Sequence, residues 1–213
     1  MIKLLLIKGC AILLIAASLP ALGKSTKNNG ENTIGTTSNC LVVGFDKNYH
    51  SNYYPDVMIA SKIGIDVNHL DTLFNNLFIT KLLTQKSKRY KYLSPENDNE
   101  FSILKENIHY VGETDDRYPE LSSVSLQSFQ TLLNKFGSDY LIVFSQYYMK
   151  KQEKPFPTLF HIINYSVYNH SKEEIMKGKV FSNSFDLVNL QELEKIFQKN
   201  ALKNMAAIEK GFE

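Results

Sequence analysis

A helix that runs directly into a long β-strand constrains the fold of this chain more than any other feature. Within 125–136, five apolar side chains recur at intervals that place them on one helical face, namely Leu126, Phe129, Leu132, Leu133 and Phe136. Gly137 favours the end of this helix, because glycine readily adopts the left-handed conformation of a helix terminus. Residues 140–148 follow, nine residues of high β propensity. The sequence therefore predicts a helix packed against a sheet.

Similar patterns predict the remaining elements. They are a strand at 40–45, a helix at 66–86 capped by Asp66, a strand at 88–95, a long loop at 94–120 with a short strand at 108–111, strands at 159–168 and 175–181, and a helix at 187–208. This order predicts the α+β class, an α/β sandwich. We expect a mixed sheet of about four to five strands, with a C-terminal antiparallel hairpin, covered by about three helices.

The N-terminal segment has the layout of a secretory signal peptide. Lys3 and Lys8 precede an uncharged run that ends at Pro20 and Gly23. The uncharged stretch 9–23 has 15 residues, whereas a membrane-spanning helix needs about 20. The sequence therefore predicts a signal peptide at 1–23, a disordered polar leader at 24–39 and a single α/β domain at 40–213.

Cleavage of that segment would leave no membrane span and one cysteine, Cys40. A lone cysteine cannot form an internal disulfide, and Cys40 opens an apolar strand, so we expect it to be buried. Cys10 lies inside the apolar run, and Cys40 follows polar residues, so neither has the position of a lipid-anchored cysteine. We expect an exported protein, periplasmic or at the cell surface, without a lipid anchor.

The charges argue against a nucleic-acid partner. The chain has 24 lysines and arginines against 22 acidic residues, and only Arg89 and Arg117 are arginines. Arginine supplies the forked contacts that grip phosphate, and a balanced charge creates no field that attracts polyanions. We therefore expect no nucleic acid among the partners.

The order of elements resembles the envelope α/β domain shared by the N-terminal domain of TolB and the curli-secretion lipoprotein CsgG. The resemblance rests on Cys40–Phe45 as the opening strand, Leu70–Leu82 as the first helix, Phe136–Val143 as the junction of helix and strand, and the hairpin of Phe160–Tyr168 and Glu174–Phe181. The chain departs from this type, since it lacks the anchoring cysteine, the transmembrane hairpins and the propeller repeats. The resemblance implies an exported, non-catalytic domain that contacts envelope components and has no transferable active site.

The sequence holds no catalytic or metal-binding motif, so we expect a non-enzymatic protein without metal or cofactor. No two of the five histidines have the spacing that places a pair of zinc ligands on one helical face. Two alternatives stay open. An exported hydrolase would combine a serine or aspartate with His50 or His109, which must lie within about 3.2 Å of a hydroxyl or carboxylate in a cleft. A small-ligand carrier would need an enclosed apolar pocket of at least about 300 Å³.

Two segments are candidates for binding a partner. Tyr49, His50, Tyr53 and Tyr54 follow the first strand, and tyrosine rings are efficient contact groups, so this loop is expected to line a groove. The alternative is that the loop folds back over the edge of the sheet.

The strand at 175–181 is expected at the edge of the sheet. It alternates apolar residues with Lys177 and Lys179, a pattern that discourages nonspecific pairing but permits a chosen strand. We therefore expect a non-enzymatic envelope or cell-surface domain. It is expected to bind a protein of the envelope, or another macromolecule, through this edge or through the tyrosine loop.

Overall fold

The computed structural model describes residues 37–213 apart from 114 and 188. The predicted signal peptide at 1–23, and residues 24–36 of the predicted leader, lie outside the described residues. Ser38 and Asn39, at the end of that leader, already belong to the first strand. This strand thus begins two residues before the predicted start at Cys40.

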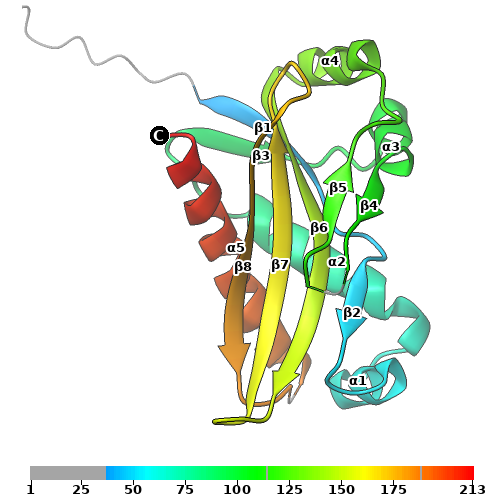
Figure 1. The fold of residues 1–213 in the computed structure, drawn as a ribbon, viewed down its shortest axis with the longest axis vertical. Helices are drawn as coiled ribbons and strands as arrows, with labels where there is room; N and C mark the ends of the chain where they lie inside the picture. The colour runs from blue at the N-terminus through cyan, green and yellow to red at the C-terminus, as the bar shows by residue number, and fades with distance from the viewer. Residues whose placement is uncertain (1–36, 114, 188) are drawn as a thin grey trace, which may run out of the picture. The chain divides into compact units, whose positions relative to one another are not determined.

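A mixed six-stranded sheet forms the centre of the domain (Figure 1). Its strands are β1 (Ser38–Val43), β2 (Tyr49–Ser51), β3 (Tyr90–Leu93), β6 (Ser138–Gln152), β7 (Thr158–Tyr168) and β8 (Glu174–Ser184). Their order is β3-β1-β6-β7-β8, with β2 paired to the second half of β6. The strands β1, β2, β3 and β6 are parallel, whereas β7 and β8 extend the sheet as the predicted antiparallel hairpin. The α+β class is confirmed.

Helices pack on both faces of the sheet (Figure 1). One face holds α2 (Leu70–Leu83) and α5 (Leu190–Gly211), and the other holds α3 (Asn99–Glu106) and α4 (Leu126–Lys135). The chain also forms α1 (Asp56–Ile63), a 3₁₀ turn (Val67–His69), and a small sheet of β4 (His109–Val111) and β5 (Tyr118–Glu120). Among the described residues no helix is long and apolar enough to cross a membrane.

Two separate cores follow from the alternation of side chains along the strands. On the α2 and α5 face, the rings of Phe74 and Phe197 have centroids 5.3 Å and 5.0 Å from that of Tyr147 in β6. On the opposite face, α3 and α4 bury Leu141 and Val143 of the same strand. Cys40 is fully buried, as predicted.

A bulge in β6 changes which side chains enter each core. The pairing of β6 with β7 shifts register between Phe144 and Gln146, so Ser145 is an extra residue in the strand. Before the bulge Phe144 points toward α2 and α5, and after it Tyr147 does so. The bulge thus places Phe144 and Tyr147 on the same face, although two residues separate them.

Polar side chains cap α3, α4, α5 and the 3₁₀ turn, and a glycine follows the end of α4 as predicted. The Ser125 side chain accepts a hydrogen bond from the Ser128 amide at the start of α4, and Gly137 after it has a φ of 55°. Asp66 caps the 3₁₀ turn rather than the α-helix, which begins at Leu70. Asn189 caps α5, so the predicted helix at 187–208 begins at Leu190.

Short elements replace much of the loop predicted at 94–120. Asp98 caps α3 by accepting a hydrogen bond from the Phe101 amide, and Phe101 and Leu104 enter the second core. The predicted strand at 108–111 is present as β4, and it pairs with β5. The sequence patterns also do not predict α1 or β2. Each of these elements has eight residues or fewer, too short a stretch for a periodic pattern to emerge.

Candidate functional site

The tyrosine segment after β1 does not form an open surface. Tyr49 begins β2 and pairs in register with Tyr147 of β6, which turns its ring into the aromatic core. Its ring centroid lies 4.8 Å from that of Phe74, and only 6% of Tyr49 is exposed. Tyr53 is 8% exposed and belongs to the same core. Burial therefore removes Tyr49 and Tyr53 from the predicted contact surface, because the segment folds back against the sheet.

Tyr54 lies at the partly buried end of this cluster, beside two lysines. Nζ of Lys62 in α1 lies 4.9 Å from the centroid of the Tyr54 ring, and Nζ of Lys151 in β6 lies 5.8 Å from it. Asp186 holds Lys62 by an ion pair of 2.9 Å. Because aromatic faces attract cations, the ring of Tyr54 is already engaged by lysines of its own chain.

His50 is the exposed residue of the predicted loop, and it contacts Arg117. Its Nε2 lies 2.9 Å from Nη1 of Arg117. A guanidinium can only donate, so Nε2 accepts this bond and the ring is neutral. Burial, and then the charge of Arg117, lowers the pKa of His50. Together with Tyr148 the pair lines a hollow of about 290 Å³.

Ion pairs and a hydrogen bond hold the turn between β4 and β5 against one face of β6, β7 and β8. Nζ of Lys150 lies 2.9 Å from Oδ2 of Asp115, and Nζ of Lys179 lies 2.6 Å from Oδ1 of Asp116. The side chain of Asn164 donates to the carbonyl of Asp115 at 3.0 Å. The hydrogen bond from Lys150 lowers the pKa of Asp115, and the bond to Asp116 raises that of Lys179. The ammonium of Lys179, a predicted binding residue, is therefore paired within the chain.

The outer side of β8 is an edge of the sheet, as the sequence predicts. Within the described residues β7 is its one neighbouring strand. Nζ of Lys203 in α5 donates to the carbonyl of Phe181 at 2.8 Å, so this carbonyl faces away from β7. The main-chain groups of every second residue in a strand face the same side. The amides and carbonyls of Lys177 and Lys179 therefore face outward too.

Exposed apolar side chains accompany these main-chain groups. Ile175 is 45% exposed and Phe181 is 54% exposed. The ring of Phe181 meets that of Phe160 in β7 edge-on, with centroids 5.9 Å apart. Lys177 is exposed as well, with its Nζ 5.2 Å from the ring centroid of Tyr118. The edge of β8 thus offers main-chain groups, apolar surface and a lysine together.

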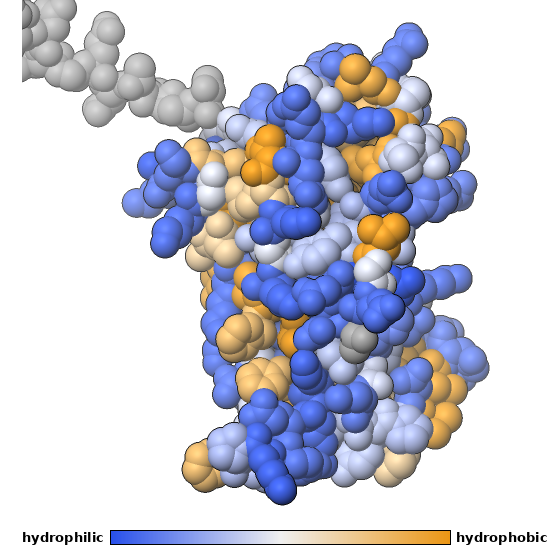
Figure 2. Space-filling model, in the orientation of Figure 1, coloured by the Kyte–Doolittle hydropathy of each residue, from blue (hydrophilic) through white to orange (hydrophobic). Residues whose placement is uncertain are grey.

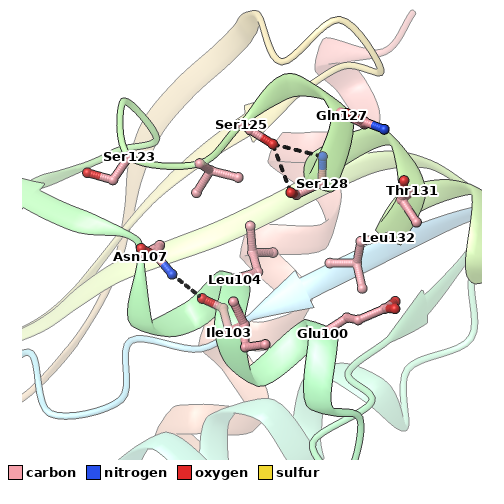
Figure 3. A pocket seen from close by; sticks show the side chains of 11 residues that line it. Glu100, Ile103, Leu104, Asn107, Ser123, Ser125, Gln127, Ser128, Thr131 and Leu132 are labelled. Atoms are coloured by element: carbon pink, nitrogen blue, oxygen red, sulfur yellow. Dashed lines mark hydrogen bonds between the residues drawn. The ribbon is translucent and has the colours of Figure 1, made fainter.

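A pocket of about 430 Å³ lies between α3 and α4, where Figure 2 shows hydrophobic side chains at the surface. Leu104 and Leu132 lie within it, and the hydroxyl of Ser125 lies on its rim (Figure 3). Nε2 of His109 lies 2.9 Å from Oγ of Ser123, which meets the distance set for the hydrolase alternative. Ser123 also lines this pocket, and Figure 3 shows its hydroxyl pointing away from Leu104 and Leu132. The hydrolase alternative therefore stays a prediction.

The remaining histidines lie apart. His69 is exposed on the 3₁₀ turn, whereas His161 is buried in the sheet. Across the described ranges, no three side chains of His, Cys, Asp or Glu come together as a metal site.

No known family model and no curated protein matches this chain. Solved structures with a similar arrangement exist. The hypothetical protein CT253 from Chlamydia trachomatis is 10% identical, with a TM-score of 0.49 over 82% of this chain and 96% of that one. The C-terminal domain of LpoB from Salmonella enterica is 12% identical, with a TM-score of 0.29 over 71% and 86%. Lipoprotein GNA1162 from Neisseria meningitidis is 11% identical, with a TM-score of 0.31 over 80% and 99%.

These findings correct one prediction. The sequence predicts a periplasmic or surface protein without a lipid anchor, whereas GNA1162 is described as a lipoprotein. The part of the prediction that excludes a lipid anchor is therefore withdrawn. The similar structures include lipoprotein-type domains, and they do not show the more specific resemblance to TolB or CsgG.

Proposed function

We propose that this protein is an envelope domain that binds a protein partner by pairing a strand of the partner with β8. One observation carries the proposal. The eleven residues of β8 form an edge whose outward main-chain groups, at Lys177 and Lys179, meet no strand in the described part of the chain. Such edges bind extended segments through main-chain hydrogen bonds. The signal peptide predicted at 1–23 supports the envelope assignment.

The side chains along β8 favour a partner strand of particular composition. Nζ of Lys177 lies 3.9 Å from Oε2 of Glu174, which is too far for a hydrogen bond. The ammonium of Lys177 is therefore available to an acidic residue of the partner. Phe181 offers apolar surface on the same side of the strand. Lys179 contributes its outward amide, because Asp116 holds its ammonium. We expect a segment with an acidic side chain opposite Lys177 and an apolar one opposite Phe181.

Lys203 protects this edge when no partner is bound. Its ammonium occupies the Phe181 carbonyl that a partner amide would otherwise meet. Lysine is a common device against indiscriminate strand pairing. Replacing it in Lys203→Met is expected to strengthen capture of the partner.

Lys179→Pro tests the proposal, because proline lacks the outward amide. Lys179→Ala is the matched control, since it loses the same ion pair with Asp116 and retains the amide. A photocrosslinking amino acid at Ile175, an exposed position on the same strand, reports the neighbour of β8 in intact cells. Mass spectrometry then identifies the adduct.

The proposal is supported if one adduct forms in the parent chain and in Lys179→Ala and is lost in Lys179→Pro, with the circular dichroism spectrum unchanged. It fails if the adduct persists in folded Lys179→Pro, or if the parent chain gives no protein adduct at all.

A further inference from the structure

A polar cleft opens at the carboxyl ends of β1 and β3. After β1 the chain passes through β2 and α1 to α2 on one face of the sheet, and after β3 it continues to α3 on the other face. In sheets wound in this way, ligands bind in the crevice between such diverging connections. Here the crevice has a volume of about 940 Å³, and it is lined by 46–48 after β1, by Ser94 and Glu96 after β3, and by side chains of both helices.

One lysine pairs with two carboxylates in this cleft. Nζ of Lys105 in α3 lies 3.2 Å from Oδ1 of Asp46 and 2.7 Å from Oε2 of Glu96. Burial raises the pKa of Asp46, although the charge of Lys105 opposes the shift. Exposed Lys47 and Glu106 add one charge of each sign at the rim. These five groups sum to a net charge of −1, and the carboxylates of Asp46 and Glu96 both pair with Lys105.

The backbone holds one wall of the cleft in place. Asp46 adopts a φ of 46°, and its amide donates to Oδ1 of Asn75 in α2 at 3.1 Å. A Cβ atom at Gly44 would lie 2.1 Å from that same Oδ1, so only glycine permits this close approach. The polar wall thus exists before any ligand arrives, which reduces the entropic cost of binding.

Uncharged polar groups occupy much of the remaining lining. Along α2, Thr72, Asn76 and Thr80 recur every fourth residue, so they form one row on the helix surface. Tyr110 and Ile79 add aromatic and aliphatic surface to the same cleft. Hydroxyl and amide side chains can both donate and accept hydrogen bonds. The cleft therefore presents paired donors and acceptors beside apolar carbon.

We propose that this cleft binds a neutral saccharide. The hydroxyls of a sugar both donate and accept, which matches the threonine and asparagine row, and its C–H faces match Tyr110 and Ile79. An anion would meet Lys105 only after that lysine left its two carboxylates. A cation would have to displace Lys105 from the same two carboxylates. The site lies apart from the edge of β8, so a failure of either proposal leaves the other standing.

The test is a chemical-shift titration of the ¹⁵N-labelled full chain. The probes are maltose, N-acetylglucosamine and its β-1,4-linked disaccharide, with inorganic phosphate as the anionic comparison and spermidine as the cationic one. Asn76→Ala removes an exposed group of the row, and Thr131→Ala removes an exposed group of the α3–α4 pocket as the matched control.

We expect saturable shifts at Asn75, Asn76 and Ser102 with at least one saccharide and none with phosphate or spermidine. Asn76→Ala should raise the dissociation constant roughly 5- to 10-fold, as the loss of about one neutral hydrogen bond does, and Thr131→Ala should leave it unchanged. The proposal is overturned if no saccharide gives a saturable shift, if a charged probe binds more tightly, or if both variants weaken binding equally.

Discussion

The hydroxyl of Tyr147 lies 2.6 Å from Nδ1 of His161, on the neighbouring strand, in the interior of the domain. The other ring nitrogen, Nε2, lies 2.9 Å from the hydroxyl of Ser184. A neutral imidazole offers one acceptor and one donor, so we assign Tyr147 as the donor to Nδ1 and Ser184 as the acceptor from Nε2. Burial lowers the pKa of His161 to about 3. The folded state therefore disfavours the protonated ring.

This pair predicts a loss of stability in mild acid. In the unfolded chain His161 gains a proton near its ordinary pKa of about 6.5, whereas in the folded chain it does so only near 3. The contribution of neutral His161 to the free energy of unfolding is complete above about pH 6.5. It falls by about 1.4 kcal/mol per pH unit as the pH drops below that value. Urea unfolding between neutral pH and about pH 5 measures the slope. His161→Gln should flatten it, and His69→Gln, at an exposed ring, should not. Equal slopes in all three proteins would refute the assignment.

Gly44→Ala should destabilise the domain by about 1–3 kcal/mol, the usual range for overpacking. The new Cβ would collide with Asn75 and lie 3.0 Å from Cγ1 of Ile79. Thermal unfolding measures the loss, and adding Asn75→Ala should recover part of it. Gly64→Ala is the control, because no atom lies within 4 Å of a Cβ added there. Only the φ of 77° disfavours alanine at that position. If the double variant shows simple additivity, the collision with Asn75 is not the cause.

Tyr53→Ala should cost stability of about 3 kcal/mol, since the ring is 8% exposed and packs in the aromatic core. Phe156→Ala removes an aromatic ring that is 74% exposed, and a change within about 0.5 kcal/mol is expected there. Denaturant unfolding compares the two. A small loss in Tyr53→Ala would mean that this ring is a surface group after all, as the sequence suggests.

The thiol of Cys40 should resist modification in the folded protein. Burial, with smaller contributions from Asp139 and Glu209, raises its pKa to about 12, and thiolate is the reactive form. In a Cys10→Ser background, labelling by a disulfide reagent should be slow without denaturant and fast in urea. Rapid labelling of the folded chain would show that β1 opens readily.

The fold is predictable where one pattern is long. The junction of α4 and β6 combines a helical apolar face, a left-handed Gly137 and a continuous β run, so three independent signals agree. The helix α1 also has readable ends, since Pro55 and Gly64 bracket it. Its middle carries only a brief apolar pattern of Ile59, Ala60 and Ile63, which a single short turn or loop could equally contain.

The candidate surfaces are less predictable, because they depend on pairings between distant parts of the chain. Tyr49 points inward through its register with Tyr147, which no local pattern around residue 49 contains. The edge position of β8 follows from the order of the strands, but the capture of Lys179 by Asp116 does not. The polar cleft draws on segments after two strands and on two helices, so its residues are adjacent only in the folded chain.

The extra residue at Ser145 sets the phase of β6. Two residues separate Phe144 from Tyr147, and the bulge lets both rings face the same core. In a regular strand that kept Ser145, Gln146 would take the inward position, and Tyr147 would lose its contact with His161. An in-frame deletion of that codon would instead restore simple alternation with Tyr147 still facing inward. The gene could therefore lose this codon and keep the facing of every later side chain in β6.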